Sequence, residues 1–114
     1  MRKIEEHMAA AIREGRDWRE GNTSVQFDAD GHFSVRLHGN EIAWGTTKAV
    51  RLSSRGWFTS TTKSRLNAVL EAVGFPGSVY QTKGVWRLYR NPLSISGPAV
   101  SPTMEFYDDM CVYV

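Results

Sequence analysis

The chain of 114 residues lacks several features that define common protein classes. Its single cysteine, Cys111, excludes an internal disulfide, and its apolar neighbours predict a buried or half-buried thiol rather than a nucleophile. No apolar run approaches the roughly 18 residues of a membrane-spanning helix. The charged start has no hydrophobic signal-peptide region. We therefore expect a soluble, cytoplasmic protein with no membrane partner.

The sequence also lacks the short motifs of several reaction types. No glycine loop ends in the Gly-Lys-Ser/Thr of a phosphate-binding motif, and no Gly-x-Ser-x-Gly nucleophile motif occurs. His7, His32 and His38 have no second His or Cys at metal-ligand spacing. Asp28 and Asp30 resemble the start of a calcium loop, but the residues that follow favour a plain turn. We expect no catalytic residues, no metal and no cofactor.

Positive charge is concentrated in the middle of the chain. Residues 46–90 contain eight Lys or Arg against Glu71 alone, a net charge of +7. Residues 1–45 carry a net charge of −2 and residues 91–114 a net charge of −3. Because opposite charges attract, an anionic partner is expected to bind the middle of the chain.

The stretch from Gly56 to Gly74 predicts an amphipathic helix. Thr61 is the expected N-cap, because its hydroxyl can accept from the free N–H groups of the first turn. Gly74 is expected to end the helix in the left-handed conformation. Four apolar residues recur at i, i+3, i+4 and i+7 and form one stripe, namely Leu66, Val69, Leu70 and Val73.

A first helix is expected over residues 2–14. A meander of strands is expected between the two helices, and a hairpin of two strands after the second helix. The alternation of apolar and polar residues predicts strands at 25–27, 33–37, 42–44, 50–52, 79–82 and 85–90. The order is helix, strand meander, helix, hairpin. It predicts an α+β fold in which two helices pack on one face of an antiparallel sheet of about four to six strands.

The composition changes after residue 90. Residues 1–90 are predicted to form a single α+β domain. Residues 91–114 read as a Pro/Ser/Gly linker followed by an acidic, aromatic C-terminal tail. That tail either adds a short strand or remains mobile.

The run from Thr59 to Arg65 is the strongest candidate for function. Five hydroxyls, two cations and the free N–H groups of a helix start suit phosphate oxygens. Trp57 next to it could stack on a base or anchor an interface. The alternative is a capped helix start with a tryptophan in the core. The predicted residues for binding a partner or nucleic acid are Arg51, Arg55, Trp57, Thr59, Thr61, Lys63, Arg65, Arg87 and Arg90.

Two strings in the chain are distinctive, Leu-His-Gly-Asn at 37–40 and Thr-Thr-Lys-Ser-Arg-Leu-Asn-Ala at 61–68. Together with the Gly-Trp-Phe-Thr that begins at Gly56, they make residues 3–90 resemble a group of small, mostly uncharacterised accessory proteins of tailed phages. Such phage proteins often work by binding a host polymerase, nuclease or immune complex, or by binding DNA. The resemblance therefore implies a binding protein that acts in the host cytoplasm.

On this basis we expect a non-enzymatic protein whose basic face binds and inhibits a host nucleic-acid-handling or defence complex, such as a CRISPR-type effector. Direct DNA or RNA binding is the alternative, and a small nuclease or nucleotide-processing enzyme is a weaker one. Reversal of Arg55, Lys63 and Arg65 to Glu is expected to abolish binding and to leave the fold intact.

Overall fold

Two helices and nine strands make up residues 2–91 and 102–114, the part of the chain that the structure, a computed structural model, describes. The fold is α+β, as predicted. In chain order the elements are α1 (Lys3–Glu14), β1 (Trp18–Glu20), β2 (Thr23–Phe27), β3 (Phe33–Leu37), β4 (Asn40–Gly45), β5 (Ala49–Leu52), α2 (Ser60–Val73), β6 (Gly77–Thr82), β7 (Val85–Arg90), β8 (Thr103–Glu105) and β9 (Met110–Tyr113).

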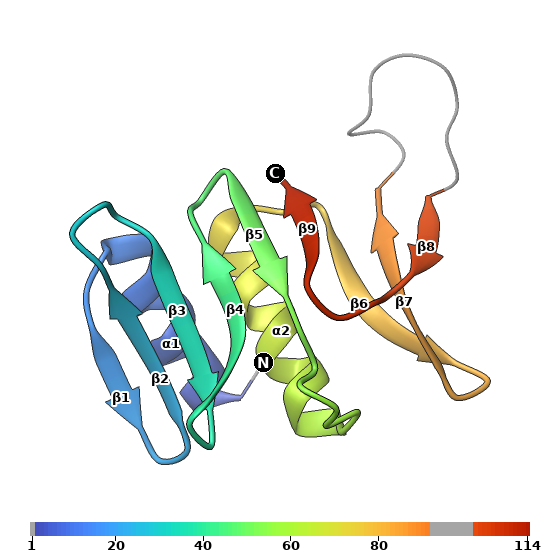
Figure 1. Ribbon diagram of the computed structural model, residues 1–114, viewed down its shortest axis with the longest axis horizontal. Coiled ribbons are helices and arrows are strands. Elements are labelled where there is room, and N and C mark those ends of the chain that lie inside the picture. The colour runs from blue at the N-terminus through green and yellow to red at the C-terminus, as the bar shows by residue number, and fades with distance from the viewer. Residues whose placement is uncertain (1, 92–101) are drawn as a thin grey trace.

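The strands form two antiparallel sheets. The main sheet has six strands in the order β1-β2-β3-β4-β5-β9, and the small sheet has three in the order β6-β7-β8. In Figure 1, α1 and α2 both lie behind the main sheet, and they contact each other as well as its strands. The prediction of two helices on one face is confirmed. The opposite face of the main sheet, which we call the open face, carries no described element.

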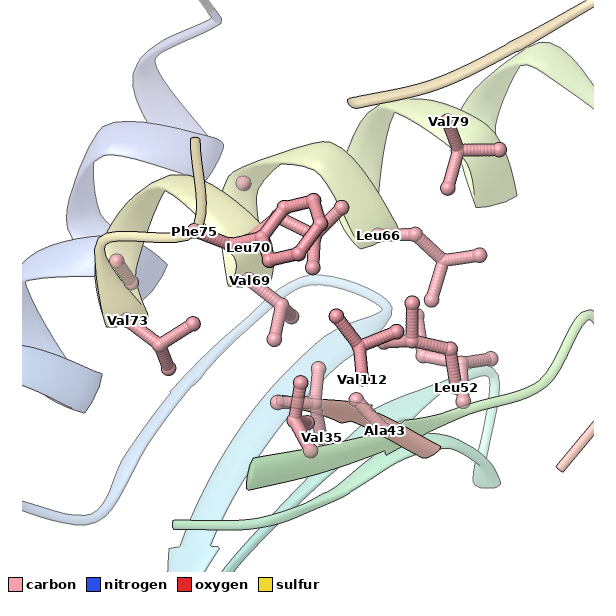
Figure 2. Packing of buried hydrophobic residues seen from close by; sticks show 14 of the residues in the cluster. Val35, Ala43, Leu52, Leu66, Val69, Leu70, Val73, Phe75, Val79 and Val112 are labelled. Atoms are coloured by element: carbon pink, nitrogen blue, oxygen red, sulfur yellow. The ribbon is translucent and has the colours of Figure 1, made fainter. Parts of the chain in front are cut away.

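The apolar stripe of α2 packs on the covered face of the main sheet. Leu66, Val69 and Leu70 are completely buried, as the helical spacing predicts. Gly74 ends the helix with a φ of +80°, a conformation that glycine adopts without strain. Figure 2 shows the α2 side chains facing residues of β3, β4, β5 and β9, namely Val35, Ala43, Leu52 and Val112.

The C-terminal segment completes both sheets. Its strand β8 pairs with β7, and β9 pairs with β5 in a register that places Val112 opposite Val50. Phe106, Met110 and Val112 are buried in the common core. The sequence left open whether the tail adds a strand or remains mobile, and the structure shows that it adds the strands β8 and β9. The change of composition at residue 90 does not mark the end of the packed domain, and residues 92–101 of the predicted linker lie outside the described residues.

The prediction for Cys111 is wrong. Met110 and Val112 face the core, so the intervening Cys111 side chain points to the other side of the sheet, where it is exposed. Apolar neighbours in the sequence suggested burial, but the period of two in a strand places adjacent residues on opposite faces.

Candidate interaction surface

The loop between β5 and α2 is fixed by a small hydrogen-bond network. Ser54 is completely buried, and its N–H and hydroxyl both donate to Asp108 Oδ1, at 2.7 and 2.8 Å. The Trp57 N–H donates to the Ser54 carbonyl at 2.9 Å. Because Asp108 precedes β9, the C-terminal segment holds this loop in position.

Two neighbouring aromatic side chains project from the loop. Trp57 is 62% exposed and Phe58 is 59% exposed, so the interpretation of Trp57 as a core residue is wrong. The Phe58 ring makes an edge-to-face contact with Trp86, with the centroids 5.0 Å apart. Phe58 is missing from the predicted site residues, although its place beside Trp57, two residues after the turn glycine Gly56, is a signal that the sequence contains.

The helix α2 begins earlier than predicted. Thr59, not Thr61, is the N-cap, and its Oγ1 accepts a hydrogen bond from the Thr62 N–H at 3.2 Å. Four hydroxyl residues stand in a row here, and the local pattern does not distinguish which of them takes the extended cap conformation. The N–H groups of Ser60 and Thr61 have no acceptor among the described residues.

Three of the predicted residues, Trp57, Thr59 and Thr61, line one hollow of about 600 Å³. Leu37 and Ile42 contribute apolar surface to it. We call Trp57, Phe58 and this hollow the aromatic edge. The hollow is also lined by Asn22, His38, Asn40, Ser54 and Thr62.

Arg51 and Arg55 are exposed and both lie near the Glu41 carboxylate, and Arg51 Nε also lies 4.0 Å from Asp109 Oδ1. Their Nη2 atoms lie 3.6 and 3.8 Å from Glu41 Oε1, and Arg55 Nε donates to the Glu41 carbonyl at 2.5 Å. Arg51 also lies over the Trp44 ring, 5.2 Å from its centroid. Much of the charge of both guanidinium groups is therefore balanced within the protein.

Arg65 is not at the surface, so its prediction as a binding residue is wrong. It is 4% exposed, and its Nη1 lies 2.7 Å from Glu5 Oε2 while its Nε donates to Thr23 Oγ1 at 3.0 Å. Burial alone would raise the pKa of Glu5, but hydrogen bonds from the Ser64 hydroxyl, the Arg2 N–H and Arg65 hold it below its ordinary value. The ion pair joins α2 to α1, and reversing Arg65 to Glu would bury two like charges.

Lys63, Arg87 and Arg90 contact the C-terminal half of the fold. Lys63 Nζ lies 3.5 Å from a glutamine oxygen of β6, and Arg87 Nη2 lies 3.5 Å from a threonine hydroxyl of β8. Arg90 donates to the Tyr113 carbonyl at 2.8 Å and stacks on Phe75 at 4.9 Å. Of the nine predicted residues, Trp57, Thr59 and Thr61 line one hollow and none of these three is basic, whereas Arg65 is buried.

Asp28, Asp30 and His32 are the group of possible metal ligands that the described residues bring together, within 4.8 Å of one another. Asp28 Oδ1 already accepts hydrogen bonds from the N–H groups of Asp30 and His32, at 2.9 and 3.0 Å. Such bonds define an Asx turn, so turn formation accounts for the position of the Asp28 carboxylate.

A family model described as Kyanoviridae Gp96 protein matches residues 1–112 of the chain. No curated protein and no solved structure matches it. Within the described residues, no helix is long and apolar enough to cross a membrane.

Proposed function

The chain belongs to the Kyanoviridae Gp96 family of cyanophage proteins, and from that premise we propose that it is a non-enzymatic accessory protein that binds and inhibits a host protein complex. The contact is made by the aromatic edge. A nucleic-acid-handling or defence complex, such as a CRISPR-type effector, is the class of target that a phage origin favours.

One observation carries this proposal. The neighbouring side chains of Trp57 and Phe58 are exposed to solvent, although the loop that bears them is tied to the C-terminal segment by two hydrogen bonds from Ser54 to Asp108. Each large aromatic ring can bury about 150–250 Å² on contact. Tryptophan is enriched among the residues that dominate the energy of protein interfaces. A preformed loop also loses little conformational entropy on binding, so most of the gain from burying the two rings would appear as affinity.

The charge distribution supports a protein as the partner of this edge. Arg65 is buried with Glu5, and Arg51 and Arg55 are paired with Glu41. Three of the six predicted cations, Arg51, Arg55 and Arg65, are therefore balanced by carboxylates within the fold. A polyanion would gain little there from counterion release, whereas burial of the aromatic rings requires no charge.

Binding of Trp57→Ala to the host partner tests the proposal. The partner is first captured from a lysate of the cyanobacterial host with the wild-type protein, identified, and purified. We expect Trp57→Ala to lose about 2 kcal/mol or more of binding free energy, as a central interface tryptophan does, which is roughly a 30-fold increase in Kd.

The matched control is Tyr113→Ala. It removes another aromatic ring, 66% exposed, which belongs to β9 and does not line the hollow of the aromatic edge. It is expected to bind normally. Equal affinity of Trp57→Ala and wild type for the purified partner would contradict the proposal.

Direct nucleic-acid binding at the start of α2 is the second candidate. The observation that favours it is the unpaired pair of N–H groups on Ser60 and Thr61, beside the Thr59 hydroxyl. Filter binding of single-stranded and duplex DNA by a Thr61→Pro variant, which removes one of these donors, would reveal a contact at this position.

A further inference from the structure

Arg19 and Arg36 differ from the other arginines of the chain. Neither has a hydrogen-bond, ion-pair or aromatic partner among the described residues. Eight arginines do have such a partner, namely Arg2, Arg13, Arg16, Arg51, Arg55, Arg65, Arg87 and Arg90.

The two unpaired arginines lie in one row across the main sheet. Arg19 of β1 pairs in register with Ser24 of β2, and Ser24 pairs with Arg36 of β3. Two strand spacings place their Cα atoms roughly 9.5 Å apart. Because Val25 and Val35 are buried on the covered face, Arg19, Ser24 and Arg36 lie on the open face, toward the viewer in Figure 1.

Both arginines line a hollow of about 810 Å³ on this face, which we call the open-face groove. The small Ser24 side chain lies between them, and Gln26 and His38 add further donors. Its single carboxylate among the described lining residues is Asp17. The Oδ1 of Asp17 accepts a hydrogen bond from a backbone N–H of β2 at 2.8 Å.

The open-face groove continues toward the start of α2. It shares Asn22 and His38 with the hollow of the aromatic edge, and the side chains of these two residues lie 3.4 Å apart. That second hollow is lined by Leu37 and Ile42, whose side chains face the helices, so the path turns around the end of the sheet. A flexible chain can follow this turn, whereas a DNA duplex, with a persistence length of about 50 nm, cannot.

We propose that the open-face groove binds the phosphates of a single-stranded nucleic acid through Arg19 and Arg36. Guanidinium groups match phosphate oxygens in charge and geometry, and hydroxyl, amide and imidazole groups complete the donor set. An acidic peptide fits less well, because the lining offers few apolar anchors beyond Trp18. This inference does not rest on the proposed function. It adds that a host complex containing exposed single-stranded nucleic acid could be held at two adjoining surfaces.

The test is fluorescence anisotropy of a labelled oligo-dT strand at about 50 mM salt and above. The test variant is Arg19→Gln/Arg36→Gln. The control is Lys3→Gln/Arg13→Gln, which removes the same net charge from exposed positions of α1, on the covered side of the main sheet. We expect affinity to fall on the order of tenfold or more in the test variant alone. The slope of log K against log salt should decrease by roughly 1.4, about 0.7 for each phosphate that an arginine no longer neutralises.

A third variant, Asp17→Asn, should bind more tightly than wild type, because it removes the repelling charge and keeps the amide oxygen as an acceptor for the β2 N–H. Trp57→Ala should keep the wild-type slope of log K against log salt for oligo-dT. A failure of the proposed host-protein contact can therefore be distinguished from a failure of the open-face groove to bind nucleic acid. Equal losses in the test and control variants, no binding of oligo-dT by wild type, equally tight binding of duplex DNA, or equally tight binding of poly-glutamate would each overturn the proposal.

Discussion

The buried ion pair between Arg65 and Glu5 makes the sharpest prediction about stability. Replacing Arg65 by Met removes the guanidinium from two contacts, 2.7 Å from Glu5 Oε2 and 3.0 Å from Thr23 Oγ1. The Glu5 carboxylate then stays buried with a weaker counter-ion, since Arg2 Nη2 is 3.5 Å away on a side chain that is 57% exposed. Breaking a buried pair on one side costs about 3–5 kcal/mol. That is a large part of the roughly 5–15 kcal/mol expected for a domain of this size.

Urea unfolding measures this cost, with the midpoint of Arg65→Met expected to fall by more than about 1 M. A double variant, Glu5→Leu/Arg65→Met, replaces the pair by apolar side chains and should recover most of the loss. Thr23 remains satisfied in both variants, because its hydroxyl also donates to a neighbouring amide oxygen at 2.8 Å. The double variant also keeps the test informative if the single variant does not fold.

The matched control is Arg13→Met, which removes an arginine whose nearest carboxylate, Glu71, lies 3.9 Å away with both side chains about half exposed. Its stability should change by less than about 0.5 kcal/mol. A loss below about 1 kcal/mol for Arg65→Met, or a double variant as unstable as the single one, would refute the reasoning about the buried pair.

Two further predictions concern acid stability and the C-terminal strand. Burial opposes ionisation of Glu5, but hydrogen bonds, led by that from Ser64, leave its pKa below 4.5. The ionised Glu5 carboxylate therefore contributes its full stabilisation of the fold above about pH 4.5, and this stabilisation is lost as the pH falls through the folded-state pKa. The difference in free energy of unfolding between wild type and Glu5→Gln should shrink from pH 7 to pH 3. An unchanged difference would contradict this. Val112→Ala should cost about 1.5–3 kcal/mol in urea unfolding, against less than about 1 kcal/mol for the exposed neighbour Tyr113→Ala; similar costs would mean that β9 does not complete the core.

The sequence predicts those elements whose signals are local. The apolar stripe of α2, its glycine stop and the alternation along β3 specify helix and strands over a few neighbouring residues, and the structure contains them. The position of β9 has no such signal, because its partner β5 lies 58 residues earlier at the pairing of Leu52 with Met110. The pairing of β9 with β5 depends on which edge of the main sheet is free after the other strands have formed. Neither the sequence of β9 nor that of β5 contains this information.

Arg65 shows the same limit within a helix. It lies three and seven residues before Ala68 and Ala72, so the three share the face of α2 that is buried in addition to the apolar stripe. Small residues there allow α1 to approach closely, and the arginine at the end of that face becomes enclosed. If α2 buried only its apolar stripe against the sheet, Arg65 would be exposed to solvent. The contact of α2 with α1, which buries Arg65, cannot be predicted from the sequence of α2 alone.

The net charge of a sequence window also differs from the charge that the folded surface displays. The window 46–90 has a net charge of +7, but two of the carboxylates that balance it, Glu5 and Glu41, lie in the acidic first part of the chain. Conversely, Arg19 and Arg36 lie in a window of net charge −2 and have no counter-ion among the described residues. Strand pairing places these two on the open face with β2 between them, whereas the packing of α2 against α1 buries Arg65. The pairs that folding forms therefore decide which cations stay without a counter-ion, and the net charge of a sequence window does not. Here two such arginines lie in the acidic start of the chain, whereas Arg51, Arg55 and Arg65 of the basic middle are paired.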